Sequence, residues 1–205
     1  MTYSTILCRR RGYNVKKKSF EEREIIDISV FTPPSPVVLI STISKDNIRN
    51  LAPVGCFSVC SYEPPMVLFA MHYGSDTVKN IQDMSDFVVG IPNAKILDNL
   101  YRCSKKLPAF EDEFVYANLS PIDSKYTKSS NINECSINLE CKVEWTKDSG
   151  DHMIICGKVV FVIVEGELAE YTNLNTLRSK LDLICHIHRN EFAIGYEKIV
   201  LAHKA

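Results

Sequence analysis

Two short segments hold the residues best suited to chemistry. The first, NLAPVGCFSVCSYEPP (residues 50–65), mixes apolar residues typical of a strand with small polar residues. Pro53 has no N–H for a strand ladder and Gly55 has no side chain, so residues 50–56 should offer backbone amides and carbonyls to a flat ligand that forms hydrogen bonds. An irregular edge strand with a bulge has the same features, and the segment by itself favours that interpretation.

The second segment, GSDTVKN (residues 74–80), is suited to bind an anion. Ser75 and Asp76 can cap a helix that begins here, and the first amides of a helix can bind a phosphate with help from the helix dipole. The alternative is a capped helix with Asn80 on its surface. The side chains that could contact an anion here or balance its charge are those of Arg49, Thr77, Lys79 and Asn80.

The motifs of several other kinds of site are absent from the sequence. There is no GxGxxG after a strand, no GxxxxGK[ST] and no CxxC. The densest group of possible metal ligands is Cys185, His186 and His188, but a tetrahedral site needs a fourth ligand and no partner pair is evident. We therefore predict no metal and interpret these three residues as partly buried side chains.

The 8 cysteines are scattered through segments that resemble strands and helices. This distribution differs from the dense spacing of a disulfide scaffold in a short secreted chain. Nothing in the sequence marks one thiol as acidic or exposed. We expect reduced cysteines that pack as small hydrophobic residues and are neither catalytic nor bridged.

The composition is that of a globular protein with one core. The chain has 205 residues, of which 45% are hydrophobic, and a net charge of −1. No apolar run approaches the length that spans a bilayer, and MTYSTILCRRRG lacks the features of a secretory signal. Together with the scattered cysteines, these features predict a cytoplasmic protein that does not associate with membranes.

Basic residues are concentrated near the start, where Arg9–Arg11 and Lys16–Lys18 flank GYNV. Such a run can contact nucleic acid, but no matching basic aromatic motif occurs elsewhere. A solvated extension is therefore the better interpretation, and nucleic-acid binding is not expected. We predict a basic N-terminal lead-in over residues 1–32 and one domain over residues 33–205.

Hydrophobic periodicity predicts mainly strands. These are expected at residues 36–42, 50–63, 66–73, 86–92, 136–145, 153–165 and, as a short closing strand or ordered tail, 191–200. Helices are expected around Val78, Ile81 and Met84, around Ile96, Leu97, Leu100 and Cys103, and around Leu174, Leu177, Leu181 and Ile184. Residues 107–124 show no clear period and should form a long surface connection. Strands joined mainly by turns predict a mainly β fold, an antiparallel barrel with peripheral helices.

The motifs together resemble those of a known family. PVVLIST, NLAPVGCFSVCSYEPPMVLFAM, DTVKNI and DFVVGIPN are similar in order and spacing to the flavin reductase-like, FMN-binding split-barrel family, which includes the flavoredoxins. The segment LPAFEDEFVYANL and the late hairpin NECSINLECKV with CGKVVFVIVE extend the resemblance more weakly, to residues 36–165. The resemblance implies a split β-barrel with Greek-key-like antiparallel strands.

The resemblance also implies a function. It indicates a homodimer with FMN at or near the subunit interface, hydride transfer from NADH or NADPH to flavin, and delivery of electrons to a small-molecule or protein acceptor. We name no catalytic side chain, because the flavin carries out the chemistry. The cofactor-binding residues that it implies are Thr42, Asn50, Ala52, Pro53, Val54, Gly55, Cys56, Ser58, Ser61, Thr77, Lys79 and Asn80.

Two positions differ from the family pattern. Gly55 stands where relatives commonly have serine, and Ser75 stands where they commonly have Lys or Arg. The chain therefore lacks one hydroxyl and one cation that could strengthen flavin binding.

Two other functions remain open. The protein could be a flavoredoxin-type electron carrier that a protein partner reduces, or a barrel without flavin that has a binding or structural role. A yellow colour of the purified protein excludes the barrel without flavin. Anaerobic bleaching by NADH or NADPH distinguishes a reductase from a carrier.

Overall fold

The computed structural model describes residues 5–10, 13–25, 27–170 and 181–195. The chain divides into two compact units, Met1–Pro33 and Pro34–Ala205. The smaller unit contains an antiparallel hairpin of β1 (Thr5–Arg10) and β2 (Tyr13–Lys18), followed by two short 3₁₀ helices, η1 (Glu22–Glu24) and η2 (Ile28–Phe31). The basic lead-in thus has secondary structure that its charge pattern did not indicate.

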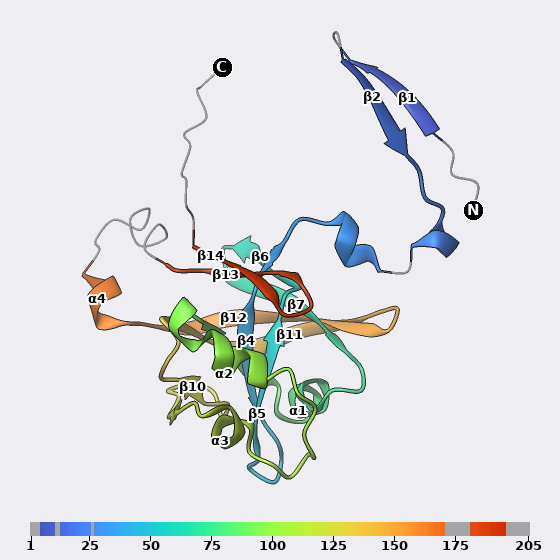
Figure 1. The fold of residues 1–205 in the computed structure, drawn as a ribbon. Coiled ribbons are helices and arrows are strands. Elements are labelled where there is room, and N and C mark those ends of the chain that lie inside the picture. Colours follow the sequence, from blue (N-terminus) through green and yellow to red (C-terminus); the bar gives the residue numbers. More distant parts are fainter. Residues whose placement is uncertain (1–4, 11–12, 26, 171–180, 196–205) are drawn as a thin grey trace. The chain divides into compact units, whose positions relative to one another are not determined.

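The main element of the larger unit is a seven-stranded antiparallel sheet (Figure 1). In spatial order its strands are β5 (Arg49–Val54), β4 (Val38–Ile43), β8 (Asp86–Ile91), β11 (Ile137–Ser149), β12 (His152–Val164), β7 (Pro65–His72) and β6 (Phe57–Tyr62).

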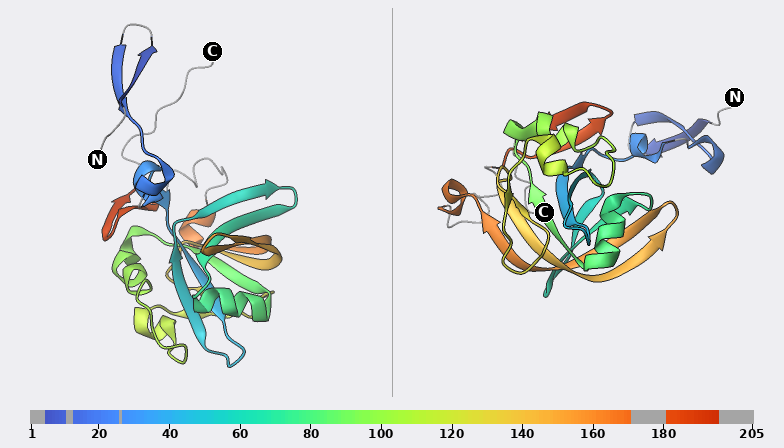
Figure 2. Two further views of the ribbon diagram at one scale, coloured as in Figure 1. Left: turned by 90° about the vertical axis from the view of Figure 1, so that its right-hand side faces the viewer. Right: turned by 90° about the horizontal axis from the view of Figure 1, so that it is seen from below.

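The two edge strands of this sheet, β5 and β6, follow each other in the sequence and are separated only by Gly55 and Cys56. The sheet must therefore curl until its edges approach at this bend, and Figure 2 shows the curvature. The Cys56 carbonyl accepts the Ala70 N–H at 3.1 Å, which fixes the bend to β7. Within the described residues, β5 and β6 do not pair with each other, so the barrel is split.

Strand β4 is buried on both faces, which explains its continuous apolar sequence. Ile40 packs in one core, where the Phe69 and Phe87 rings meet edge to face with their centres 5.2 Å apart. Leu39, the preceding residue, points to the other face and packs in a second core with Leu51. The sheet therefore separates two hydrophobic cores.

The helices and the short strands complete the two cores. Helix α1 (Asp76–Met84) packs on the first core, and α2 (Leu97–Arg102), after η3 (Ala94–Ile96), packs with α3 (Glu113–Ala117) on the second. The remaining elements are α4 (Gly166–Ala169), the pair β9 (Pro121–Ile122) and β10 (Asn131–Ile132), and a small sheet of β3 (Ser35–Pro36), β13 (Ile184–His188) and β14 (Glu191–Ile194).

The structure confirms the mainly antiparallel β architecture and corrects three elements. The segment over residues 50–63 forms two strands, because the bend at Gly55 and Cys56 sends β5 and β6 to opposite edges. Residues 107–124 are not a surface connection, because α3 and β9 lie there and Phe114 is fully buried in the second core.

The third correction concerns the last expected helix. Leu174 and Leu177 lie outside the described residues, Leu181 lies in no helix, and Ile184 begins strand β13. Pairing with β3 and β14 holds β13 extended, and this pairing overrides the local helical spacing. The expected closing strand is present as β14, and residues 196–200 lie outside the described residues.

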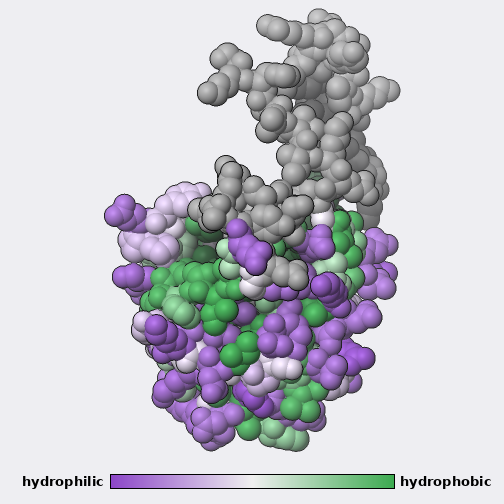
Figure 3. All heavy atoms as spheres, turned by 90° about the vertical axis from the view of Figure 1, so that its left-hand side faces the viewer, coloured by the Kyte–Doolittle hydropathy of each residue, from purple (hydrophilic) through white to green (hydrophobic). Residues whose placement is uncertain are grey.

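Two further observations concern the surface of the molecule and the length of its helices. Most of the face shown in Figure 3 is hydrophilic, and hydrophobic side chains gather there in a few patches. Among the helices of the described ranges, none combines the length and the apolar character needed to cross a membrane.

Candidate functional site

The start of α1 faces strands β4 and β5. Ser75 caps the helix, because its Oγ accepts the Val78 N–H at 3.2 Å. Thr77 and Asn80, three residues apart, lie on the buried face of the helix. The sequence therefore positions both side chains toward the sheet.

Four of the residues predicted to bind a cofactor come together in one buried network. The Asn50 Oδ1 accepts the hydroxyl of Thr42 at 3.0 Å and that of Thr77 at 2.8 Å. The Asn80 amide donates to the Thr42 Oγ1 at 3.1 Å. Each of the four residues is only 1–8% exposed. These side chains satisfy one another, and any contact with a ligand must be made in addition to these bonds or in their place.

Glu113, which the sequence did not single out, completes the network. Its Oε2 accepts the Asn50 side-chain amide at 2.8 Å and the Leu51 N–H at 2.5 Å. Burial raises the pKa of Glu113 to about 7. The hydrogen bond from the Leu51 N–H lowers this pKa, and the nearby Asp76 and Asp112 carboxylates raise it. The signal that could have identified this residue is the Asp-Glu pair directly before the apolar Phe114.

Arg49 and Asp112 hold this corner of the site together. The Arg49 guanidinium donates from Nε to the Asp112 carboxylate at 2.7 Å and forms an ion pair with it. Asp112 also caps α3, because its Oδ1 accepts the Phe114 N–H at 2.9 Å. Arg49 is thus paired with a carboxylate and ties β5 to α3.

The free edge of β5 borders this network. The Leu51 N–H bonds to Glu113, so it points away from β4. Every second residue of an antiparallel strand points its backbone groups the same way, so Pro53 presents its carbonyl on this edge and has no N–H there. The expectation that this segment offers bare backbone groups thus corresponds to a free sheet edge.

A cavity of about 250 Å³, here called the α1 cavity, lies between this edge and the start of α1. Its opposite wall is the segment after α2, which carries Lys105 and Lys106. These two lysines were not predicted, and they supply positive charge that Ser75 does not. The lining residues are Asn50, Leu51, Ala52, His72, Gly74, Ser75, Asp76, Thr77, Cys103, Ser104, Lys105, Lys106, Leu107 and Glu113.

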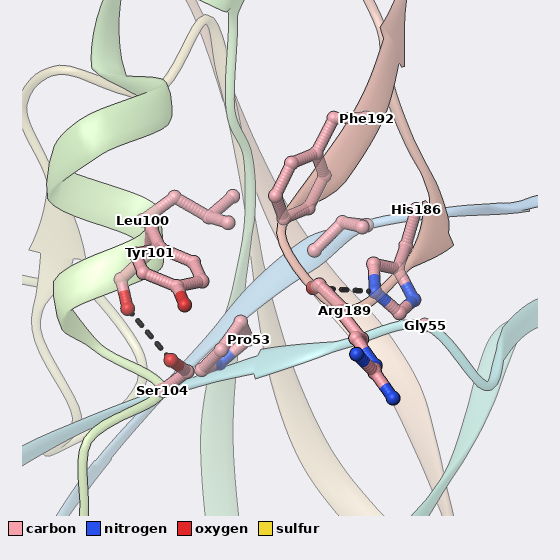
Figure 4. A pocket seen from close by; sticks show the side chains of 9 residues that line it. Pro53, Gly55, Leu100, Tyr101, Ser104, His186, Arg189 and Phe192 are labelled. Atoms are coloured by element: carbon pink, nitrogen blue, oxygen red, sulfur yellow. Dashed lines mark hydrogen bonds between the residues drawn. The ribbon is translucent and has the colours of Figure 1, made fainter.

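A second cavity, of about 200 Å³, continues along β5 (Figure 4). We call it the aromatic–arginine pocket. Ser104 lines both cavities, and the β5 wall passes from Ala52 in the first to Pro53 in the second. We refer to these two neighbouring cavities together as the groove along β5. The lining residues of the second are Val37, Pro53, Gly55, Leu100, Tyr101, Ser104, His186, Arg189 and Phe192.

The other predicted site residues lie apart from the α1 cavity. Lys79 is exposed and borders a third cavity, of about 70 Å³, which shares Asn50, Asp76 and Glu113 with the α1 cavity. Val54 is buried in the first core, so its side chain cannot contact a ligand in the groove. Cys56 and Ser58 are exposed and Ser61 is half-buried, the two serines on strand β6. The predicted set is thus spread over β4, β5, α1, β6 and the bend between β5 and β6.

The cysteines and histidines form no metal centre in the described ranges, where no cluster of three or more possible ligands occurs. Burial raises the pKa of the Cys103 thiol to about 12. The Cys60 and Cys156 sulfurs lie 3.6 Å apart, and every cysteine of the described part whose side chain is placed is free. The His186 Nε2 lies 3.0 Å from the Arg189 carbonyl oxygen, within the β13–β14 hairpin.

Known proteins share this fold. The nitrilotriacetate monooxygenase component B of Bacillus cereus aligns with a TM-score of 0.80 and 23% identity, over 89% of this chain and 98% of that one. Flavoredoxin of Methanosarcina acetivorans aligns with a TM-score of 0.75 and 21% identity, over 87% and 94%. These similarities confirm the split-barrel fold.

Sequence comparison identifies the family. An uncharacterised protein of Aquifex aeolicus strain VF5 is 33% identical over 147 residues, which are 69% of this chain and 74% of that protein. The family model described as flavin reductase like domain matches residues 31–181. This range contains β5, α1 and most of the groove, and the chain is a member of the flavin reductase-like domain family.

Proposed function

We propose that the groove along β5 binds FMN and that the protein is a flavin reductase that uses NADH or NADPH. The observation that carries this proposal is the free edge of β5, which borders a groove with a helix start and two lysines at one end. Membership of the flavin reductase-like family supports a redox function that involves flavin.

The groove fits the phosphate of FMN at the α1 end. Asp76 and Thr77 begin a helix of nine residues, whose first amides and dipole favour an anion. Lys105 and Lys106 face the same cavity, and neither forms an ion pair with a described residue. A dianionic phosphate would meet two cations and a helix start there, with the Asp76 and Glu113 carboxyl groups also in the lining.

The groove also fits the ring of FMN. The β5 edge offers the Leu51 and Pro53 carbonyls to the polar edge of an isoalloxazine, and Leu100 adds apolar wall. The two neighbouring cavities measure about 250 and 200 Å³, and ligand pockets typically measure about 300–1,000 Å³. Glu113 keeps the free edge in place because it holds the Leu51 N–H.

FMN and the protein residues have different roles in this proposal. Bound FMN supplies hydride and electron transfer between a nicotinamide and an acceptor. The protein residues hold the phosphate, orient the ring through backbone groups and exclude water from one side. No side chain of the α1 cavity needs to move a proton in this proposal.

We further propose a homodimer. Several large apolar side chains on strands β6, β11 and β12 are exposed: Tyr62 by 92%, Val59 by 53%, Val162 by 46% and Trp145 by 43%. Exposed apolar side chains of this size are typical of an interface, and a partner subunit could cover the second side of the flavin. Light scattering at micromolar concentration tests this proposal, and a monomer that holds FMN stoichiometrically would contradict it.

The function is tested by a visible spectrum of the purified protein, recorded before and after anaerobic addition of NADH or NADPH. Bound oxidised flavin that bleaches on addition is the expected result. A yellow protein that does not bleach would instead support an electron carrier, a role to which the similarity to a flavoredoxin also points. A protein that neither contains nor takes up FMN would overturn the proposal.

A further inference from the structure

The aromatic–arginine pocket has walls that suit a flat ring. The Tyr101 ring from α2 and the Phe192 ring from β14 meet nearly perpendicular, at 83°, with their centres 6.5 Å apart. Figure 4 shows both rings among the side chains that line the cavity, together with Leu100 from α2 and Pro53 from β5. Aromatic and apolar side chains in this arrangement favour a planar aromatic ligand.

The other side of the pocket is positively charged. Arg189 lines it from the β13–β14 turn, and its guanidinium forms no ion pair within the described part of the chain. His186 stands beside it and is held by the 3.0 Å contact of its Nε2 with the Arg189 carbonyl oxygen. None of the lining residues is acidic. An anionic group that entered the pocket would therefore meet a guanidinium that pairs with no carboxylate of the described residues.

The backbone at Arg189 is unfavourable for its residue type. Its φ of 50° lies in the left-handed region, where a residue with a side chain other than Asn or Asp costs on the order of 1 kcal/mol. Asparagine or glycine would make the same turn with less strain. The turn by itself therefore does not explain an arginine here, whereas a role for its side chain does.

We propose that the aromatic–arginine pocket binds a planar aromatic ring that carries a negative charge at its edge. Arg189 pairs with the charge, and the Tyr101 and Phe192 side chains pack against the ring. Two sources supply this chemistry. One is a small aromatic carboxylate, which needs no flavin to bind. The other is the flavin ring itself, which is anionic when reduced, and only this source rests on the function proposed above.

The test uses the full chain without flavin. Three probes are titrated against it, and their binding is measured by ligand-observed NMR. Benzoate has both the ring and the charge, benzamide keeps the ring without the charge, and cyclohexanecarboxylate keeps the charge without a flat ring. We expect benzoate to bind most tightly. The proposal is overturned if benzoate binds no better than the other two probes.

Variants assign the binding to the named residues. Arg189→Asn should weaken benzoate about tenfold or more and leave benzamide unchanged, because only the charge-assisted contact is lost. Asparagine suits the left-handed turn, so this variant should unfold at no lower temperature than the wild type. Phe192→Leu should weaken both benzoate and benzamide. Arg102→Gln, an exposed arginine that does not line the pocket, is the control. Unchanged benzoate binding by Arg189→Asn would contradict the proposal.

The same titration on protein loaded with FMN distinguishes the two sources. If FMN displaces benzoate, the flavin ring occupies the pocket, and if both bind together, the pocket serves a second ligand. Should FMN not bind at all while benzoate binds through Arg189, the proposed function fails and the aromatic carboxylate site stands.

Discussion

The side chains of Asn50 and Glu113 are joined by a hydrogen bond of 2.8 Å, although 63 residues separate them in the sequence. Glu113 also holds the N–H of Leu51, the next residue along the free edge of β5. Glu113 therefore bonds to the side-chain network of Asn50 and also to the backbone of β5 that lines the α1 cavity. Its protonation should therefore be visible in the stability of the protein.

Glu113→Gln should remove a pH dependence of folding. Burial raises the pKa of Glu113 from 4.5 to about 7, so between these values the folded protein holds a proton that the unfolded chain releases. The contribution of Glu113 to the free energy of unfolding therefore falls as the pH rises through this window and is constant above it. Relative to the variant, the free energy of unfolding of the wild type should fall by on the order of 3 kcal/mol across this window.

Urea unfolding of wild type and Glu113→Gln at several pH values between about 4 and 8 measures this difference. Glutamine keeps an oxygen that can accept from Asn50 and Leu51, so the variant should fold. Parallel curves for the two proteins across the range would show that Glu113 does not titrate there.

Lys105→Gln together with Lys106→Gln should weaken FMN more than riboflavin, which lacks the phosphate. The loss for FMN should be on the order of tenfold or more, because charge-assisted contacts are the strong ones. Flavin fluorescence titration measures both affinities. Lys158→Gln, an exposed lysine on β12, is the control. Equal weakening of the two flavins would place the phosphate elsewhere.

Thr77→Val should destabilise the fold by about 1–3 kcal/mol, because the buried Asn50 Oδ1 loses one of its two donors. Thr77→Ser keeps the hydroxyl and should cost less. Chemical denaturation ranks the two variants. A valine variant as stable as the serine variant would show that this hydrogen bond contributes nothing.

Gly157→Ala should destabilise the protein by about 1–3 kcal/mol through overpacking. A Cβ at this position would lie 2.4 Å from the Cζ of Phe87, which belongs to the first core. Gly166→Ala is the matched control, since a Cβ there meets no atom within 4 Å. Thermal unfolding should separate the two variants, and equal melting temperatures would refute the steric argument.

Cys56→Ser and Cys60→Ala should leave electron transfer intact, because we assign these thiols no role in it. Both residues are exposed, so a thiol reagent should label them in the native protein, whereas the buried Cys103 should resist. Anaerobic reduction kinetics of the flavin-loaded variants checks the redox part. Loss of electron transfer with FMN still bound would reveal a redox thiol.

The sequence by itself determined the elements whose pattern is local. Continuous apolar runs predicted β4 and β8, and the alternation over residues 136–145 predicted β11, because burial on one or both faces leaves a direct trace in residue type. The Ser75 cap and the helical spacing of Val78 and Ile81 predicted α1 in the same way. The family motifs then placed Thr42, Asn50, Thr77 and Asn80 in one site, and these four residues do meet.

Only the tertiary structure decided the rest of the site. Glu113, Lys105 and Arg189 lie far along the chain from Asn50, and which of them line the groove depends on how the sheet curls and where the later segments pack. Phe114 and Ile184 were misplaced for the same reason, since long-range packing and strand pairing, and no local period, fix their conformations. A local pattern indicates whether a residue is buried. Which residue packs against it depends on the tertiary structure.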